Sequence, residues 1–127
     1  MIKLDQQKKG IMNIKEYNCT LDKVLSFLSK SVKRRIILHL FTCHEKECDV
    51  NVLAELLKEK QSNVSKHLSD LNKHLIIEAK QEGLYRFYYL NPIFTKKYHS
   101  LLEEIHKIDN ESIDCECVND GHLNNNG

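Results

Sequence analysis

Five cysteines are the most reactive side chains in this 127-residue chain. Thiolates bind soft, thiophilic ions, and they also undergo reversible oxidation. The number of cysteines is odd, and the opening segment is polar where a secretory signal would be apolar. Both features predict reduced thiols in a cytoplasmic protein without a membrane span, rather than a disulfide framework. The cysteines are therefore candidates for metal binding or for thiol redox chemistry.

Four of the cysteines form two close pairs, Cys43 with Cys48 and Cys115 with Cys117. The first pair brackets a short polar connection between two predicted helices, and the second lies in an acidic segment near the C-terminus. A flexible segment that folded back onto the first pair would complete a trigonal or tetrahedral thiolate site. We therefore predict these four cysteines as ligands of a soft metal or metalloid ion, such as arsenite, cadmium, lead or zinc. Cys19, just before the first predicted helix, is a further candidate.

Other interpretations of the possible ligands stay open. Cys43 could be a buried core residue and the C-terminal pair incidental, because cysteine is often buried without any chemistry. A thiol oxidoreductase is disfavoured, since no segment supplies the strand-to-helix context or the base that activates such thiols, and we predict no enzymatic activity. Another possible zinc site would lie on one face of the last predicted helix, although an ordinary exposed face explains the same pattern. Its residues are His99, Glu103 and His106.

The charge is divided unevenly along the chain. Residues 1–100 hold 18 Lys and Arg against 11 Asp and Glu, whereas residues 101–127 hold 1 against 7. A basic body favours polyanions such as DNA, although a lysine-rich solvated surface gives the same balance. We predict three parts: a flexible N-terminal segment at 1–18, a DNA-binding and dimerisation domain at 19–110, and a flexible acidic tail containing cysteines at 111–127.

Four amphipathic helices are predicted before residue 76. Thr20 and Ser31 can cap the first two, and Asp49 or Asn51 can cap the third. Apolar residues three and four apart lie on one face of each helix, and those of the third helix are predicted to point inward. They are Leu21, Val24, Leu25 and Leu28 in the first helix; Val32, Ile36, Ile37, Leu40 and Phe41 in the second; Val52, Leu53, Leu56 and Leu57 in the third; and Val64, Leu68, Leu71 and Leu75 in the fourth. The short link between the third and fourth helices is typical of a helix-turn-helix.

The spacing of apolar residues along the sequence changes after the fourth helix. Residues 76–80 and 84–90 predict a two-stranded hairpin with a turn at 81–83. Asn91 as cap and Pro92 at the first position then begin one long helix. Its apolar stripe, which suits packing against a partner helix, consists of Phe94, Tyr98, Leu101, Ile105 and Ile108. The predicted fold is mainly α with a β-hairpin wing, a winged helix-turn-helix.

Polar residues on the first two turns of the fourth helix point away from its apolar face. Hydroxyl, amide and cationic groups in this position can reach base edges and phosphates of double-stranded DNA, although a solvated face would show the same composition. Lys80 and Arg86 flank the wing tip and can contact the DNA backbone. The predicted DNA-binding residues are Gln61, Ser62, Asn63, Ser65, Lys66, His67, Lys80 and Arg86.

The stretch LAELLKEKQSNVSKHLSDLNKHLIIEAKQEGLYRFYYLN, residues 53–91, resembles the core of the ArsR/SmtB family of metal-responsive winged-helix repressors. The resemblance extends from about Leu21 to Ile108 and includes SKSVKRRIILHLF. Its most specific part is QSxVSxHLxxL, from Gln61 to Leu71. The resemblance implies a homodimer formed through the first and last helices, a palindromic operator, and repression that is relieved when an effector binds.

The chain departs from the family pattern at several positions. Lys60 stands where Ser or Thr often caps the reading helix, and Leu84 replaces the basic residue common after the wing glycine. An ungapped alignment places Asp49 and Asn51 at the two positions of a Cys-x-Cys found in thiol-rich sensors of the family. Cys48 lies next to that motif position, so the familiar ligand motif is absent.

These features predict a homodimeric repressor that dissociates from its operator when a thiophilic ion binds cysteine thiolates. The alternative is the same repressor fold acting as a thiol redox or reactive-sulfur sensor, with a disulfide between the two cysteine pairs. A winged helix that binds a protein partner and no DNA is a third possibility, which charge reversal at Lys66 and Lys80 would separate from the first.

Overall fold

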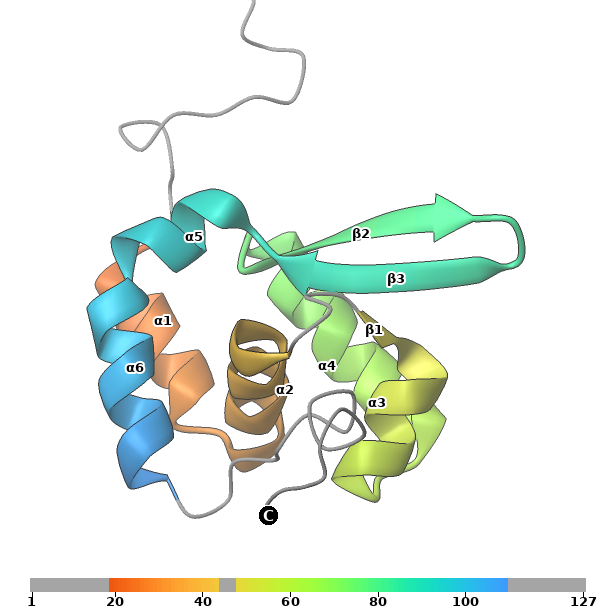
Figure 1. The fold of residues 1–127 in the computed structure, drawn as a ribbon, viewed down its shortest axis with the longest axis horizontal. Helices are drawn as coiled ribbons and strands as arrows, with labels where there is room; N and C mark the ends of the chain where they lie inside the picture. The colour runs from red at the N-terminus through yellow and green to blue at the C-terminus, as the bar shows by residue number, and fades with distance from the viewer. Residues whose placement is uncertain (1–18, 44–47, 110–127) are drawn as a thin grey trace, which may run out of the picture.

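The computed structural model describes residues 19–43 and 48–109 (Figure 1). The helices and strands follow each other in the order expected of a winged helix. They are α1 (Leu21–Leu28), α2 (Ser31–Thr42), β1 (Cys48–Asp49), α3 (Val50–Leu57), α4 (Gln61–Lys73), β2 (Ile77–Glu82), β3 (Tyr85–Leu90), α5 (Pro92–Lys97) and α6 (His99–Ile108). The prediction of a mainly α fold with a β-hairpin wing, a winged helix-turn-helix, is confirmed.

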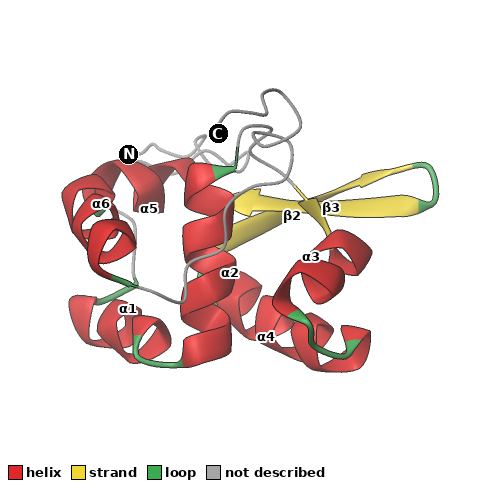
Figure 2. Cartoon of the chain, turned by 60° about the horizontal axis from the view of Figure 1, so that its bottom comes forward, coloured by secondary structure: helices red, strands yellow, loops and turns green. Residues whose placement is uncertain are grey.

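Helix α2 is central to this arrangement. Figures 1 and 2 show α1, α5 and α6 on one side of α2, and α3, α4 and the hairpin on the other. Five consecutive residues of α2, from Ile36 to Leu40, are buried. A helix that is covered on several sides must bury more than one stripe, and this stretch includes His39 as well as apolar side chains. None of the described helices is long and apolar enough to cross a membrane.

The helix-turn-helix is formed by α3 and α4. The side chain of Asp49 caps α3 by accepting a hydrogen bond from the Val52 N–H at 2.9 Å, as predicted. Lys58 ends α3 in the left-handed conformation, with φ 58°, and the Glu59 N–H donates to the Ala54 carbonyl. The predicted inward position of Val52 is wrong, because this side chain is 43% exposed.

Two helix boundaries differ from their predictions for local reasons. The Thr20 side chain caps α1, as predicted, but Ser31 is the first residue of α2 and Lys30 is its N-cap without a side-chain hydrogen bond. Leu75 was predicted to lie in the fourth helix, but α4 ends at Lys73 and Leu75 has φ 65°. The Ile76 N–H donates to the Leu71 carbonyl, which closes the reversal that leads into β2.

The wing is part of a three-stranded antiparallel sheet with strand order β1-β3-β2. The sequence did not predict β1, which has only two residues and pairs Cys48 with Tyr88 and Asp49 with Phe87. The turn between β2 and β3 lies at Gly83 and Leu84, slightly later than predicted. Gly83 has φ 62°, which glycine adopts without steric cost.

The predicted long C-terminal helix is broken into α5 and α6. Asn91 caps α5 by accepting a hydrogen bond from the Ile93 N–H, and Pro92 is its first residue, as predicted. Tyr98 interrupts the helix with φ −109° and ψ 19° and is buried against Phe94, with ring centroids 5.4 Å apart. The predicted stripe is therefore divided, because its first two residues belong to the protomer's own core, whereas Ile108 is 71% exposed.

An ion pair fixes the end of α6 to the start of α2. Arg34 Nε lies 2.7 Å from Asp109 Oδ2, and Arg34 Nη1 donates to the Leu28 carbonyl at 2.9 Å. The two charged side chains are mostly buried. Salt therefore screens this ion pair less than it would screen an exposed pair. This contact holds α1, α2 and α6 together at one end of the molecule.

Candidate nucleic-acid interface and soft-donor cluster

Helix α4 separates a polar outer face from an apolar inner face. Val64 and Leu68 are fully buried, whereas the predicted DNA-binding residues of the first two turns are exposed or half-buried. The exposed ones are Gln61, Ser62, Ser65 and Lys66; the half-buried ones are Asn63 and His67. The Asn63 amide donates to Glu59 Oε1 at 3.0 Å. The helix is therefore anchored by its buried inner face and presents hydroxyl, amide and ammonium groups on its outer face.

The N-terminus of α4 has no side-chain cap. Lys60 is the N-cap, and its carbonyl accepts from the N–H groups of Asn63 and Val64. A helix N-terminus carries partial positive charge and favours negatively charged groups such as phosphates. With Lys66 exposed one turn later, this end of α4 suits a nucleic-acid backbone.

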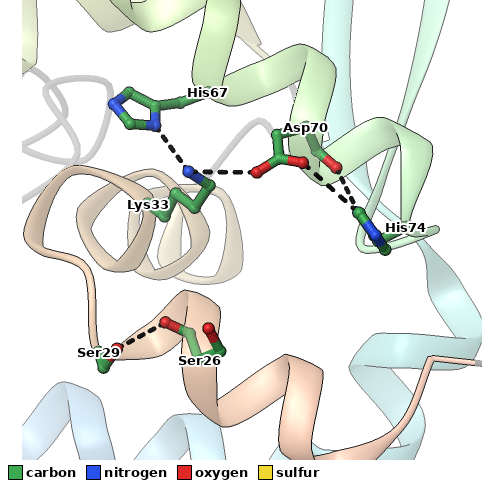
Figure 3. A network of polar contacts seen from close by, with 6 residues as sticks. All are labelled: Ser26, Ser29, Lys33, His67, Asp70 and His74. Carbon is green, nitrogen blue, oxygen red and sulfur yellow. Dashed lines mark hydrogen bonds and ion pairs between the residues drawn. The ribbon is translucent and has the colours of Figure 1, made fainter.

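His67 points toward α2 rather than straight outward (Figure 3). Its Nδ1 lies 2.9 Å from Nζ of Lys33, a buried residue on the first turn of α2. Burial lowers the pKa of His67, and the Lys33 charge lowers this pKa further. The neutral imidazole can therefore accept a hydrogen bond from the Lys33 ammonium group.

Lys33 is the centre of a polar network between α2 and α4. Its Nζ lies 3.3 Å from Asp70 Oδ2 and 5.8 Å from the centroid of the Phe27 ring. His74 lies 3.6 Å from the other Asp70 oxygen (Figure 3). The His74 ring also packs edge-on against Phe27. Sequence reasoning did not single out Lys33. The place of Lys33 beside the apolar positions of the second helix was a usable signal.

The wing carries its two predicted cations on opposite faces. Gln81 pairs with Arg86 and Lys80 pairs with Phe87, and successive side chains of a strand alternate between faces. Lys80 Nζ lies 3.5 Å from Glu82 Oε2, and the Arg86 guanidinium lies 5.9 Å from the Tyr88 ring centroid. Leu84 at the tip is 95% exposed. This placement suits contacts to both sides of a groove.

Two of the four predicted metal ligands lie together in the core. Cys43 Sγ and Cys48 Sγ are 3.9 Å apart, far longer than a disulfide bond of about 2.05 Å. Cys43 is the C-cap of α2, and Cys48 belongs to β1. Cys115 and Cys117 lie outside the described residues.

His39 is a third donor that sequence reasoning missed. Its Nε2 lies 3.2 Å from Cys48 Sγ, and the donor atoms of His39, Cys43 and Cys48 all lie within 4.8 Å of one another. We call these three residues the soft-donor cluster. Burial lowers the pKa of His39, which favours the neutral form that binds metals. The available signal was the i, i+4 spacing of His39 and Cys43, which places both on one face of α2.

The residue types of the soft-donor cluster fit a metal ion. Thiolate and imidazole are the usual ligands of zinc and of softer ions. His39 Nδ1 is buried without a hydrogen-bond partner among the described residues, which is unusual for a histidine that only fills space in the core. The cluster therefore contains donors suited to a thiophilic or borderline cation.

The other proposed ligands lie elsewhere in the described parts of the chain. Cys19 is buried near Tyr98, whose pKa is raised by burial and by the charge of Cys19. His99 and Glu103 form an exposed pair on α6, with Nδ1 and Oε1 3.8 Å apart. Neither set belongs to the soft-donor cluster.

Several solved structures show that this chain is similar in fold to winged-helix proteins. HlyU from Vibrio cholerae superposes with a TM-score of 0.58 at 22% identity, over 67% of this chain and 86% of its own. The transcriptional repressor BigR from Xylella fastidiosa superposes with a TM-score of 0.57 at 25% identity, over 67% of this chain and 81% of the repressor. The homodimeric winged helix-turn-helix domain of Mb0332 from Mycobacterium bovis superposes with a TM-score of 0.52 at 20% sequence identity, over 84% of each chain. These likenesses define the class of protein, a winged helix.

A sequence relative identifies the family. The chain is 33% identical over 72 residues to MJ1325 of Methanocaldococcus jannaschii, an uncharacterized HTH-type transcriptional regulator, covering 57% of this chain and 80% of that protein. The chain therefore belongs to the HTH-type transcriptional regulators, which are not enzymes. No protein-family profile matches it.

Proposed function

We propose that this protein is an ArsR/SmtB-type repressor that binds operator DNA as a homodimer and releases it when a thiophilic ion binds. The single observation that carries the proposal is that β1 belongs both to the soft-donor cluster and to the sheet of the wing. Cys48 supplies a donor atom to the cluster, and its backbone pairs with Tyr88 of β3. Effector binding and DNA binding thus share one short strand.

The DNA-binding part of the proposal rests on α4 and the wing. The exposed Ser62, Ser65 and Lys66 can reach a major groove, while Val64 and Leu68 hold the helix on the core. The wing cations can contact phosphates on either side of the hairpin, which gives affinity without sequence discrimination. MJ1325 is itself named as an HTH-type regulator.

The dimer is proposed from exposed apolar residues on α1 and α6. Leu21 and Leu25 are 52% and 46% exposed, and Ile108 is 71% exposed. Both helices lie on the side of α2 away from the wing (Figure 2). Pairing of two protomers through this side would bury the apolar groups and leave both α4 helices free for a two-fold symmetric operator.

The effector is proposed to be a soft metal or metalloid ion held at Cys43 and Cys48, with Cys115 and Cys117 as further candidate ligands. Arsenite, cadmium, lead and zinc are the candidates. An ion can release DNA only if it binds the DNA-free geometry more tightly than the DNA-bound one. The position of Cys48 at the base of the wing provides a physical basis for such a difference.

Thiol oxidation is a second candidate signal, favoured by the 3.9 Å separation of the two sulfurs. An oxidant such as peroxide would remove two electrons and two protons and join the sulfurs as a disulfide. The tail cysteines could react in the same way with either sulfur.

Gel-shift titration of the reduced protein with DNA from upstream of its own operon tests the proposal. We expect operator binding without effector and release on adding one of the ions. Lys66→Glu combined with Lys80→Glu should abolish operator binding, and Lys96→Glu on α5 is a matched charge reversal away from α4 and the wing. Release by oxidant and by none of the four ions would support the redox version instead. Wild-type protein that binds no operator at low salt would contradict the proposal.

A further inference from the structure

We infer that His39, Cys43 and Cys48 together form the inner ligand set for a borderline divalent cation of the zinc type, with the tail cysteines dispensable for binding. The inference deepens the proposed function, on which its regulatory consequence rests. It changes the expected chemistry from an all-thiolate site to one with a single imidazole and two thiolates. His39, which carried no role in the sequence interpretation, becomes a direct ligand.

Two of the three donor separations within the cluster match those around a bound zinc ion. Two sulfurs bound at about 2.3 Å in tetrahedral geometry stand about 3.8 Å apart, and Cys43 and Cys48 are separated by 3.9 Å. A nitrogen bound at about 2.0 Å lies about 3.5 Å from such a sulfur, and His39 Nε2 is 3.2 Å from Cys48 Sγ. These two separations are within a few tenths of an ångström of the bound values, and the third, between His39 and Cys43, is at most 4.8 Å.

Burial and charge together favour a divalent ion. His39, Cys43 and Cys48 are 1%, 2% and 8% exposed, and an uncompensated charge is costly in such surroundings. Two thiolates and a neutral imidazole carry two negative charges, which a divalent cation cancels. Copper(I) would leave one negative charge. Zinc also accepts mixed nitrogen and sulfur ligands readily.

Each ligand is attached to an element that bears on DNA binding. His39 and Cys43 lie at the C-terminal end of α2, where the Cys43 N–H donates to the His39 carbonyl at 2.7 Å. Cys48 lies in β1, and the next residue, Asp49, caps α3. An ion bound to all three side chains fixes β1 relative to α2. It therefore constrains both the start of the helix-turn-helix and the base of the wing.

Metal titration of the full-length reduced protein tests the ligand set. Cobalt(II) reports thiolate coordination by its absorption, and competition with zinc(II) gives the zinc affinity. We expect Cys43→Ser, Cys48→Ser and His39→Gln each to weaken zinc binding by at least about tenfold. Cys19→Ser, a matched change at a buried cysteine outside the cluster, should keep wild-type affinity. The double variant Cys115→Ser, Cys117→Ser should stay within about threefold of wild type.

X-ray absorption spectroscopy of the zinc-loaded wild type avoids any variant that fails to fold. We expect two sulfurs at about 2.3 Å and at least one imidazole nitrogen at about 2.0 Å. A shell of four sulfurs, or a loss of zinc binding confined to the tail variant, would overturn the ligand assignment. Metal-free protein that binds no operator would instead defeat the proposed function, because zinc binding is measured without DNA.

Discussion

The two ends of α2 contact the DNA-binding half of the molecule in different ways. At the N-terminal end, Lys33 connects to His67 and Asp70 of α4 through contacts of 2.9 and 3.3 Å. At the C-terminal end, His39 and Cys43 face Cys48 of β1, and one nitrogen of His39 has no partner among the described residues. The first end is a contact of hydrogen bonds and an ion pair, whereas the second is a cluster of two thiols and an imidazole. A regulator can keep one end fixed and use the other to respond to an effector.

The largest expected loss of stability comes from the apolar inner face of α4, next to the contacts of Lys33 with this helix. Leu68→Ala should destabilise the protein by about 2–5 kcal/mol, because a fully buried leucine leaves a cavity. Ser65→Ala on the exposed face of the same helix should change the free energy of unfolding by less than about 0.5 kcal/mol. Denaturant titration of both variants measures the difference. Equal effects would mean that α4 is not anchored by its inner face.

The Lys33 network is expected to contribute less than the apolar inner face of α4. Lys33→Met keeps most of the side-chain volume but leaves Asp70 and His67 without the ammonium group, and should cost about 1–2 kcal/mol. Zinc affinity should be unchanged, since the soft-donor cluster is at the other end of α2. Calorimetric unfolding and zinc competition on the same variant separate the two ends. A large loss of zinc affinity would show that the ends are not independent.

Acidification should weaken the N-terminal contact. The pKa of His67 is lowered in the folded state by burial and by Lys33, so the unfolded chain binds more protons below the ordinary value of 6.5. The stability from neutral His67 is therefore present above that value and is lost as pH falls through the folded pKa. His67→Gln should reduce the stability difference between about pH 7.5 and about pH 5.5, measured by denaturant titration. An unchanged difference would assign the effect to other groups.

The smallest expected effect is a change in DNA affinity caused by a substitution at the wing tip. The wing tip is connected to the soft-donor cluster through β3. Leu84→Lys adds a cation at a residue that is 95% exposed, so the fold should tolerate it. If the wing lies against DNA, affinity should rise a few-fold and the slope of log K against log salt should steepen by about one. Salt-dependent binding curves measure this. An unaltered slope would place the tip away from phosphates.

Local sequence signals predicted most of the fold. The caps at Thr20, Asp49 and Asn91 and the apolar periodicity gave the helices, and the aromatic and branched residues gave the hairpin. The break at Tyr98 was not predictable from period alone, because a buried aromatic residue keeps the apolar spacing on both sides of the interruption. Strand β1 is too short to show a pattern and exists only through its pairing with β3.

The two candidate sites differed in how far they could be predicted. The residues proposed to contact DNA follow directly from the polar face of one helix, as at Ser65 and Lys66. A buried cluster depends on tertiary contacts between residues that a helix and a separate strand supply. For this reason, Cys43 and Cys48 were paired by their chemistry, but His39 and Lys33 were recognised only once their neighbours in space were known.

The ion pair between Arg34 and Asp109 holds the end of α6 beside the first turn of α2. Arg34 lies nine positions before Cys43, a rise of about 14 Å along α2. Asp109 and the soft-donor cluster are therefore held at opposite ends of one helix.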